Sequence, residues 1–155
     1  MGKLQGRVAR GLILYAQRLA WLHATPRPPT GSPRAEKFNL ATALSRFDQL
    51  RKDKVPVQMP PVLVPHIITR WIEIGVTGSN GMSTVPLSWS EITAWQANTL
   101  VRLSPWESRM IHALSRAYVQ QSRISEDEAC PTPWRGEVTE AEKAAEVAVL
   151  DAVLG

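Results

Sequence analysis

The clearest hydrophobic pattern of the chain lies in residues 86–120, where apolar residues recur every three or four positions. Two helix starts stand in this stretch, each a Ser followed three residues later by a Glu. In such a capping box the Ser oxygen accepts a hydrogen bond from a backbone N–H, and the Glu reaches back to the N–H of the Ser. The pairs are Ser88 with Glu91 and Ser104 with Glu107. They predict a helical hairpin over about residues 88–122.

The helical period also predicts which side chains of this hairpin point inward. The first helix then buries Ile92, Trp95, Thr99 and Leu103. The second helix buries Trp106, Met110, Ala113, Leu114, Ala117, Tyr118 and Gln121. Indole rings therefore stand at both ends of the predicted hairpin.

Residues 2–23 form a second helical pattern, with apolar positions on one face and mostly basic positions on the other. A secretory signal peptide is disfavoured because Gln17 and Arg18 interrupt the apolar run. A membrane-surface helix is a second alternative. We expect this helix to dock on the rest of the protein or on a partner. A linker with four prolines, residues 25–33, follows it, so the helix is predicted to be a detachable arm.

The remaining chain predicts short helices separated by proline and glycine. One is expected from Ser32-Pro33 to about Lys52, one around residues 64–74 with Gly75 as its cap, and one from Thr139 to Leu154. The glycine-rich run between them, residues 75–86, lacks the strand and the Lys of a phosphate-binding loop. We expect an all-α single small domain of five or six short helices. Its predicted parts are an arm (1–24), a linker (25–33), a helical core (34–124), a linker (125–138) and an acidic C-terminal helix (139–155).

The charge distribution divides the chain into a basic body and an acidic tail. Residues 1–125 carry 16 Lys and Arg against 6 Asp and Glu, whereas residues 126–155 carry 2 against 8. A basic body suits nucleic acid or an acidic protein partner, and the acidic tail could also cover it. Plain solvated surface with partial self-neutralisation is the simplest interpretation.

The sequence offers little for catalysis or metal binding. Cys130 is the only cysteine, which excludes an internal disulfide and any metal site with several cysteines. His23, His66 and His112 have no His, Cys or acidic neighbour at ligand spacing. Glu91 is explained by helix capping. The sequence therefore predicts a non-enzymatic protein without cofactor or metal.

Four arginines recur every seven residues, at Arg102, Arg109, Arg116 and Arg123. Since seven residues are almost two helical turns, the last three fall along one edge of the second hairpin helix, and Arg102 lies just before its cap. A solvated edge is the simple interpretation. The alternative is a clamp for an acidic helix or a phosphate backbone.

A DNA-binding helix-turn-helix fits this hairpin only loosely. The basic edge agrees with it, but the turn LVRLSP contains no glycine. The second helix begins Pro105-Trp106-Glu107, which places an acid where bases would be read. Nucleic acid is therefore disfavoured as a partner but stays an alternative.

Residues 60–120 resemble the small tail assembly proteins of long-tailed bacteriophages, the tail assembly chaperones and their short relatives encoded beside the tape measure gene. The resemblance covers about 60 of the 155 residues. It rests on a Pro-Pro lead-in to a Trp-bearing helix, a glycine loop, a Pro-Leu-Ser helix start, and the ends of the second hairpin helix. The residues are Pro60, Pro61, Trp71, Pro86-Leu87-Ser88, Glu91-Ile92, Trp95, Pro105-Trp106-Glu107 and Ala117-Tyr118.

The resemblance implies a helper that coats the tape measure protein and brings tail-tube subunits to it in the cytoplasm of the infected host. Grooves lined by Trp and Met suit binding of an amphipathic helix. We therefore expect a partner-binding region made of the four arginines together with Trp71, Trp95, Trp106 and Met110, while packing of the indoles in the core is the simpler interpretation. A DNA-binding regulator and a structural tail protein retained in the virion are the alternatives, a homo-oligomer is left open, and no membrane partner is expected.

Overall fold

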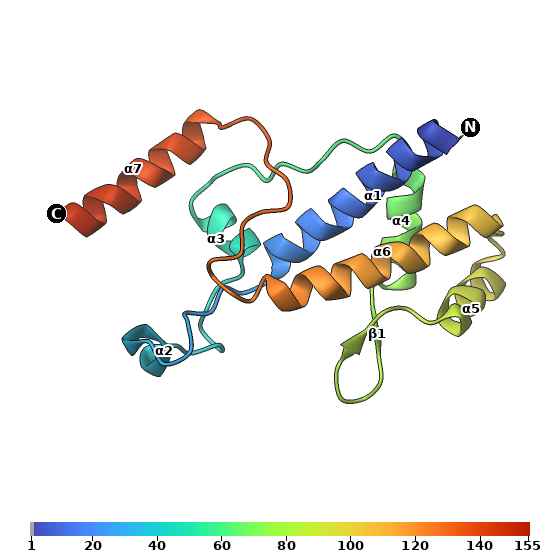
Figure 1. The fold of residues 1–155 in the computed structure, drawn as a ribbon, viewed down its shortest axis with the longest axis horizontal. Coiled ribbons are helices and arrows are strands. Elements are labelled where there is room, and N and C mark those ends of the chain that lie inside the picture. Colours follow the sequence, from blue (N-terminus) through green and yellow to red (C-terminus); the bar gives the residue numbers. More distant parts are fainter. Residues whose placement is uncertain (1) are drawn as a thin grey trace.

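Two long helices, α1 (Gly2–His23) and α6 (Pro105–Ile124), cross the middle of the molecule side by side (Figure 1). The structure is a computed structural model that describes residues 2–155. The contact between these two helices is the most extensive between any elements in that range. Smaller elements surround the pair, and they are α2 (Pro33–Lys37), α3 (Arg46–Lys52), α4 (Pro65–Ile74), β1 (Gly78–Ser79), β2 (Thr84–Val85), α5 (Trp89–Thr99) and α7 (Glu140–Leu154).

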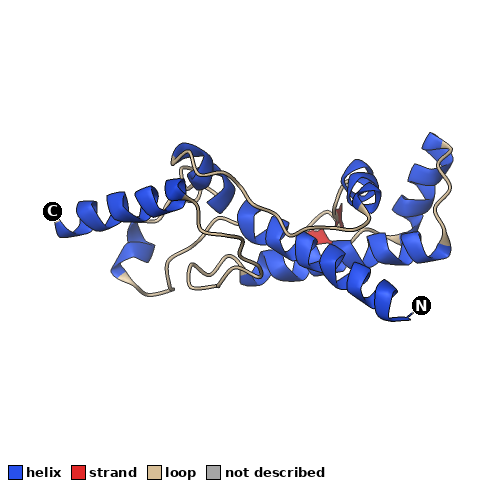
Figure 2. Cartoon of the chain, turned by 90° about the horizontal axis from the view of Figure 1, so that it is seen from above, coloured by secondary structure: helices blue, strands red, loops and turns tan. Residues whose placement is uncertain are grey.

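The chain is therefore a mostly helical single domain, as the sequence predicts, with seven helices rather than five or six in the described residues (Figure 2). The predicted glycine loop contains a small antiparallel hairpin, in which Gly78 pairs with Val85. Within residues 2–155, no helix combines the length and the apolar character that a bilayer span demands.

The two capping boxes predicted for the hairpin are present at the starts of α5 and α6, and a third, Thr139 with Glu142, opens α7 at its predicted start. Gly75 ends α4 at φ 128°, a conformation that glycine adopts without strain. Around the hairpin, α6 packs against α1 and α4, and α5 contacts α4. The two hairpin helices thus form where expected, but the main packing partner of α6 comes from the N-terminal end of the chain.

The core shows why α1 does not behave as a detachable arm. Its Leu12 and Ala16 are fully buried and contact a cluster contributed mainly by α4 and α6. The buried members of this cluster are Leu12, Ala16, Ile67, Ile68, Trp71, Leu87, Ile92, Leu103, Met110, Ile111 and Leu114. The proline linker after α1 is also held, because the N–H of Arg27 donates to the carbonyl of Glu126 at 2.7 Å. The predicted docking of this helix on the rest of the protein is therefore confirmed, whereas the expectation of a detachable arm is wrong.

The prediction of one helix from Ser32 to Lys52 is also wrong, because two short helices, α2 and α3, occupy this region. The Asn39 side chain accepts a hydrogen bond from the N–H of Ala41 at 3.0 Å and holds a turn between them. Ser45 then caps α3 by accepting from the N–H of Asp48 at 3.1 Å. These short polar side chains offer the backbone an alternative to a continuous helix.

Candidate functional site

The predicted arginine edge is present and faces solvent. Arg102, Arg109, Arg116 and Arg123 are all exposed, and none forms a salt bridge within residues 2–155. Arg123 donates to the backbone carbonyl of Thr84 at 3.4 Å, which connects this end of α6 to the hairpin. The other three cations are available to an acidic partner.

The predicted tryptophan and methionine positions lie mostly in the core. Trp71 is fully buried, donates to the carbonyl of Val76 at 3.0 Å and packs edge-on against Tyr118. Met110 is 7% exposed and belongs to the same core. Trp95 and Trp106 are partly buried and pack against it. As a correction to the expected partner-binding region, the structure assigns Trp71 and Met110 to folding rather than to a binding surface.

A different indole lies beside the arginine edge. Trp89, the first residue of α5, is 52% exposed and stacks on His112 of α6, with ring centroids 4.2 Å apart and planes at 8°. Sequence reasoning missed this pair because Trp89 stands outside the inward face of α5. The sequence does indicate that His112 shares a face of α6 with the arginines, because it lies three residues after Arg109 and four before Arg116.

We name Trp89, Arg109, His112 and Arg116 the Arg–indole surface. It combines a half-exposed aromatic stack with two cations that have no acidic partner among the described residues. Burial lowers the pKa of His112 below its ordinary 6.5, and the nearby Arg116 lowers it further. At neutral pH the imidazole is thus uncharged, and the positive charge of this surface comes from the arginines. Trp and Arg are the residue types most enriched among residues that dominate binding energy.

Glu107 at the start of α6 does not neutralise the positive charge of Arg109 and Arg116, because its carboxylate is already paired with another group of the protein. Glu107 forms a salt bridge with Arg70 of α4 and lies 3.7 Å from His66. Burial by itself raises the pKa of Glu107, but hydrogen bonds from Ser104 and the charges of Arg70 and His66 outweigh that effect. The net result is a lowered pKa. Glu107 therefore caps α6 and joins it to α4.

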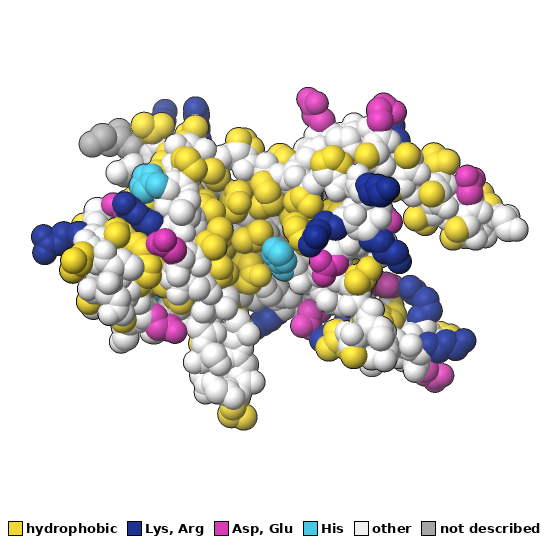
Figure 3. All heavy atoms as spheres, turned by 180° about the vertical axis from the view of Figure 1, so that it is seen from behind, with side chains coloured by type: hydrophobic (Ala, Val, Ile, Leu, Met, Phe, Trp, Pro, Cys, Tyr) yellow, Lys and Arg dark blue, Asp and Glu magenta, His cyan; other side chains and the backbone are white. Residues whose placement is uncertain are grey.

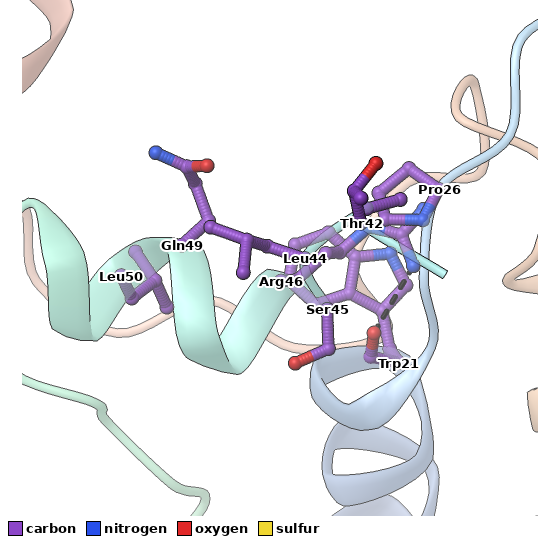
Figure 4. A pocket seen from close by; sticks show the side chains of 9 residues that line it. Trp21, Pro26, Thr42, Leu44, Ser45, Arg46, Gln49 and Leu50 are labelled. Carbon is purple, nitrogen blue, oxygen red and sulfur yellow. Dashed lines mark hydrogen bonds between the residues drawn. The ribbon is translucent and has the colours of Figure 1, made fainter. Parts of the chain in front are cut away.

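An apolar groove opens between the end of α1 and α3 (Figure 4), with a volume of about 570 Å³. We name it the Trp21 groove. Leu44 at its edge is 40% exposed. The residues that line it are Trp21, Pro26, Thr42, Ala43, Leu44, Ser45, Arg46, Gln49 and Leu50. This groove was not predicted from the sequence, because its walls come from α1, the linker and a helix start that was placed incorrectly.

Arg46 holds together the segments that form the Trp21 groove. Its guanidinium lies 4.5 Å from the centroid of the Trp21 ring. It donates to the carbonyls of Trp21 at 3.0 Å, of Ser125 at 2.7 Å and of Asp127 at 3.0 Å. One side chain of α3 therefore joins the ends of α1 and α6. Because the guanidinium of Arg46 is already hydrogen-bonded to backbone carbonyls, the groove presents mainly apolar surface to a ligand.

Further hydrophobic side chains gather across the middle of the rear face of the molecule (Figure 3). Residues 2–155 contain no group of three or more His, Cys, Asp or Glu side chains placed to hold a metal ion. The features that stand out in the described residues are the Arg–indole surface and the Trp21 groove. No protein family, curated protein or solved structure matches this chain.

Proposed function

We propose that this protein is a non-enzymatic tail assembly protein of a long-tailed bacteriophage that binds an amphipathic helix of the tape measure protein. The proposal combines the resemblance of residues 60–120 with the surfaces of the folded chain. It places the protein in the cytoplasm of the infected host, where tail-tube subunits are brought to the coated tape measure protein.

The Trp21 groove is the observation that carries this proposal. Its volume of about 570 Å³ lies within the range of about 300–1,000 Å³ that ligand pockets occupy. Its lining is largely apolar, as helix-in-groove recognition requires, since such helices insert side chains spaced three and four residues apart. Trp21, Leu44 and Leu50 are among the side chains that line the groove, so an inserted side chain would contact apolar groups from α1, from α3 and from the segment before α3 (Figure 4).

The test is co-purification of the protein with its tape measure protein after co-expression, followed by titration with peptides that cover the tape measure helices. We expect one or a few amphipathic peptides to bind. Leu44→Asp places a charge in the groove and should weaken binding at least tenfold. Leu63→Asp is the matched control, because Leu63 is 66% exposed and lies outside the groove.

Binding that survives high salt is expected for an apolar groove. Failure of every tape measure segment to bind, or equal loss from both Asp variants, would contradict the proposal. In the second case circular dichroism of each variant shows whether it is folded.

A DNA-binding regulator is the second candidate, and the exposed, unpaired Arg109 and Arg116 favour it. Neutralising phosphates releases counterions, so a regulator would lose DNA affinity steeply as salt rises. Mobility shift with duplex DNA across a salt series measures this. A third candidate, a structural protein retained in the virion, predicts that the chain is found by mass spectrometry in purified particles.

A further inference from the structure

The C-terminal helix α7 is little covered by the rest of the molecule. None of its residues is buried, although 10 of its 15 residues are Ala, Val or Leu. A helix with apolar residues on nearly all sides is normally enclosed by other elements, and an isolated helix of this length is marginal in water. This helix therefore calls for a partner that covers it.

Its surface divides into two apolar faces, since successive residues turn by about 100° around a helix. One is made of alanines and Val149, and with the turn at Asp53 and Lys54 it lines a groove of about 520 Å³. The other carries the bulkier Val147, Leu150 and Leu154, which are 55%, 56% and 82% exposed.

Acidic residues border the bulky face. By the same rotation, Glu146 falls along one edge of it and Asp151 along the other. The helix has four acids against one lysine, and that lysine contacts Glu140 at 3.2 Å. Glu146 and Asp151 form no salt bridge within residues 2–155. The outer face of α7 is thus an apolar stripe between two free carboxylates.

The segment before α7 prevents it from reaching far over its own body. The Arg18 guanidinium donates to the hydroxyl of Thr132 at 2.9 Å, and the Trp21 indole donates to the carbonyl of Cys130 at 2.9 Å. The Gln58 amide donates to the carbonyl of Glu137 at 2.8 Å, two residues before the cap of α7. The connection is therefore anchored along its length.

The Arg–indole surface has the complementary design: an aromatic stack flanked by Arg109 and Arg116, which lie about 10 Å apart along α6 at 1.5 Å per residue. It includes the start of α5, and α5 and α7 lie at opposite ends of the longest axis of the molecule (Figure 1). The two complementary surfaces of one chain therefore cannot meet each other.

We propose that α7 of one copy docks on the Arg–indole surface of a second copy. Val147, Leu150 and Leu154 cover the stack of Trp89 on His112, and the carboxylates of Glu146 and Asp151 pair with the guanidinium groups of Arg109 and Arg116. Because the two surfaces differ, the contact is head-to-tail, and it generates a ring if the rotation closes or a filament if it does not.

The test uses two full-length charge-reversal variants. The first, Arg109→Glu with Arg116→Glu, makes the Arg–indole surface acidic and leaves α7 unchanged. The second, Glu146→Lys with Asp151→Lys, makes α7 basic and leaves the Arg–indole surface unchanged. In each variant the two surfaces carry charge of the same sign. Analytical ultracentrifugation over a concentration series should show association of the wild type and a monomer for each variant.

An equimolar mixture of the two variants provides the decisive measurement. Each α7 then meets a surface of opposite charge on the other variant, so association should return to the wild-type level. Lys37→Glu with Lys52→Glu is the matched control, since it changes the net charge by the same amount at exposed positions of α2 and α3 and should associate as the wild type does.

Three results would overturn the proposal. A wild type that stays monomeric at every concentration excludes the contact. An arginine variant that associates as well as the wild type indicates that α7 pairs with α7 instead. Folded variants that fail to associate when mixed exclude the pairing of these charges. None of these results bears on peptide binding in the Trp21 groove, so the two proposals fail separately.

Discussion

The hydroxyl of Ser115, fully buried in the middle of α6, accepts a hydrogen bond from the backbone N–H of Leu87 at 2.8 Å. Leu87 is itself 2% exposed and directly precedes the cap of α5. The bond therefore fixes the position of the start of α5 along the axis of α6. It also satisfies a backbone donor that no water can reach.

Ser115→Ala should lower the free energy of unfolding by about 1–3 kcal/mol, because it leaves the buried N–H of Leu87 without an acceptor. Urea unfolding followed by tryptophan fluorescence measures the change. Ser122→Ala on the same helix is the control and should stay within about 0.5 kcal/mol of the wild type. Equal effects of the two substitutions would show that the hydrogen bond contributes little.

Arg46→Lys should destabilise the protein by about 1.5–3 kcal/mol, since an ammonium group cannot reach the carbonyls of Trp21, Ser125 and Asp127 together in the planar fork that arginine provides. Arg51→Lys, an exposed position of the same helix, is the matched substitution and should be nearly neutral. The comparison is made by thermal and chemical unfolding. A neutral Arg46→Lys would mean that the three bonds are replaced by water without loss.

Glu107 should contribute to stability at neutral pH and lose that contribution in acid. Its folded-state pKa lies below the ordinary 4.5, so its stabilisation is present above the unfolded pKa and disappears as pH falls through the lower, folded value. Unfolding measured from pH 7 down to pH 3 should therefore show a smaller loss for Glu107→Gln than for the wild type. Glu73→Gln on an exposed position of α4 should follow the wild-type curve.

Arg116→Gln should raise the pKa of His112, because it removes the cation that disfavours a protonated imidazole. Burial, the larger cause, remains, so the pKa should stay below the ordinary 6.5. Titration of the imidazole protons by NMR measures it. Arg123→Gln, about three helical turns along α6 from His112, is the control. An unchanged pKa in Arg116→Gln would show that Arg116 points away from the stack.

Local signals in the sequence predicted helix starts and ends well. The capping boxes of α5, α6 and α7, and Gly75 at the end of α4, depend on residues within one helical turn of each other. The exposure of the arginine edge also followed from the helical period. Where a local signal was overlooked, as with the cap at Ser45, the helix boundary was misplaced.

Relations between distant parts of the chain could not be predicted in this way. The Trp21 groove needs three separate segments to meet, and the stack of Trp89 on His112 needs the start of α5 to face the side of α6. The spacing of apolar residues shows which face of a helix is buried, but it does not identify the helix that packs against that face. For the same reason, a Trp such as Trp71 reads equally well as a core residue or as a binding residue until the packing is known.

The pairing of α1 with α6 also sets an order of events during synthesis. The ribosome completes α1 first, but its partner begins about 80 residues later, and at about 5–20 residues per second that is a delay on the order of ten seconds. During this interval the apolar side of α1, with Leu12 and Ala16, has no native cover. The nascent chain is therefore exposed to wrong associations until α6 emerges, and release of a chain truncated before residue 105 would make that exposure permanent.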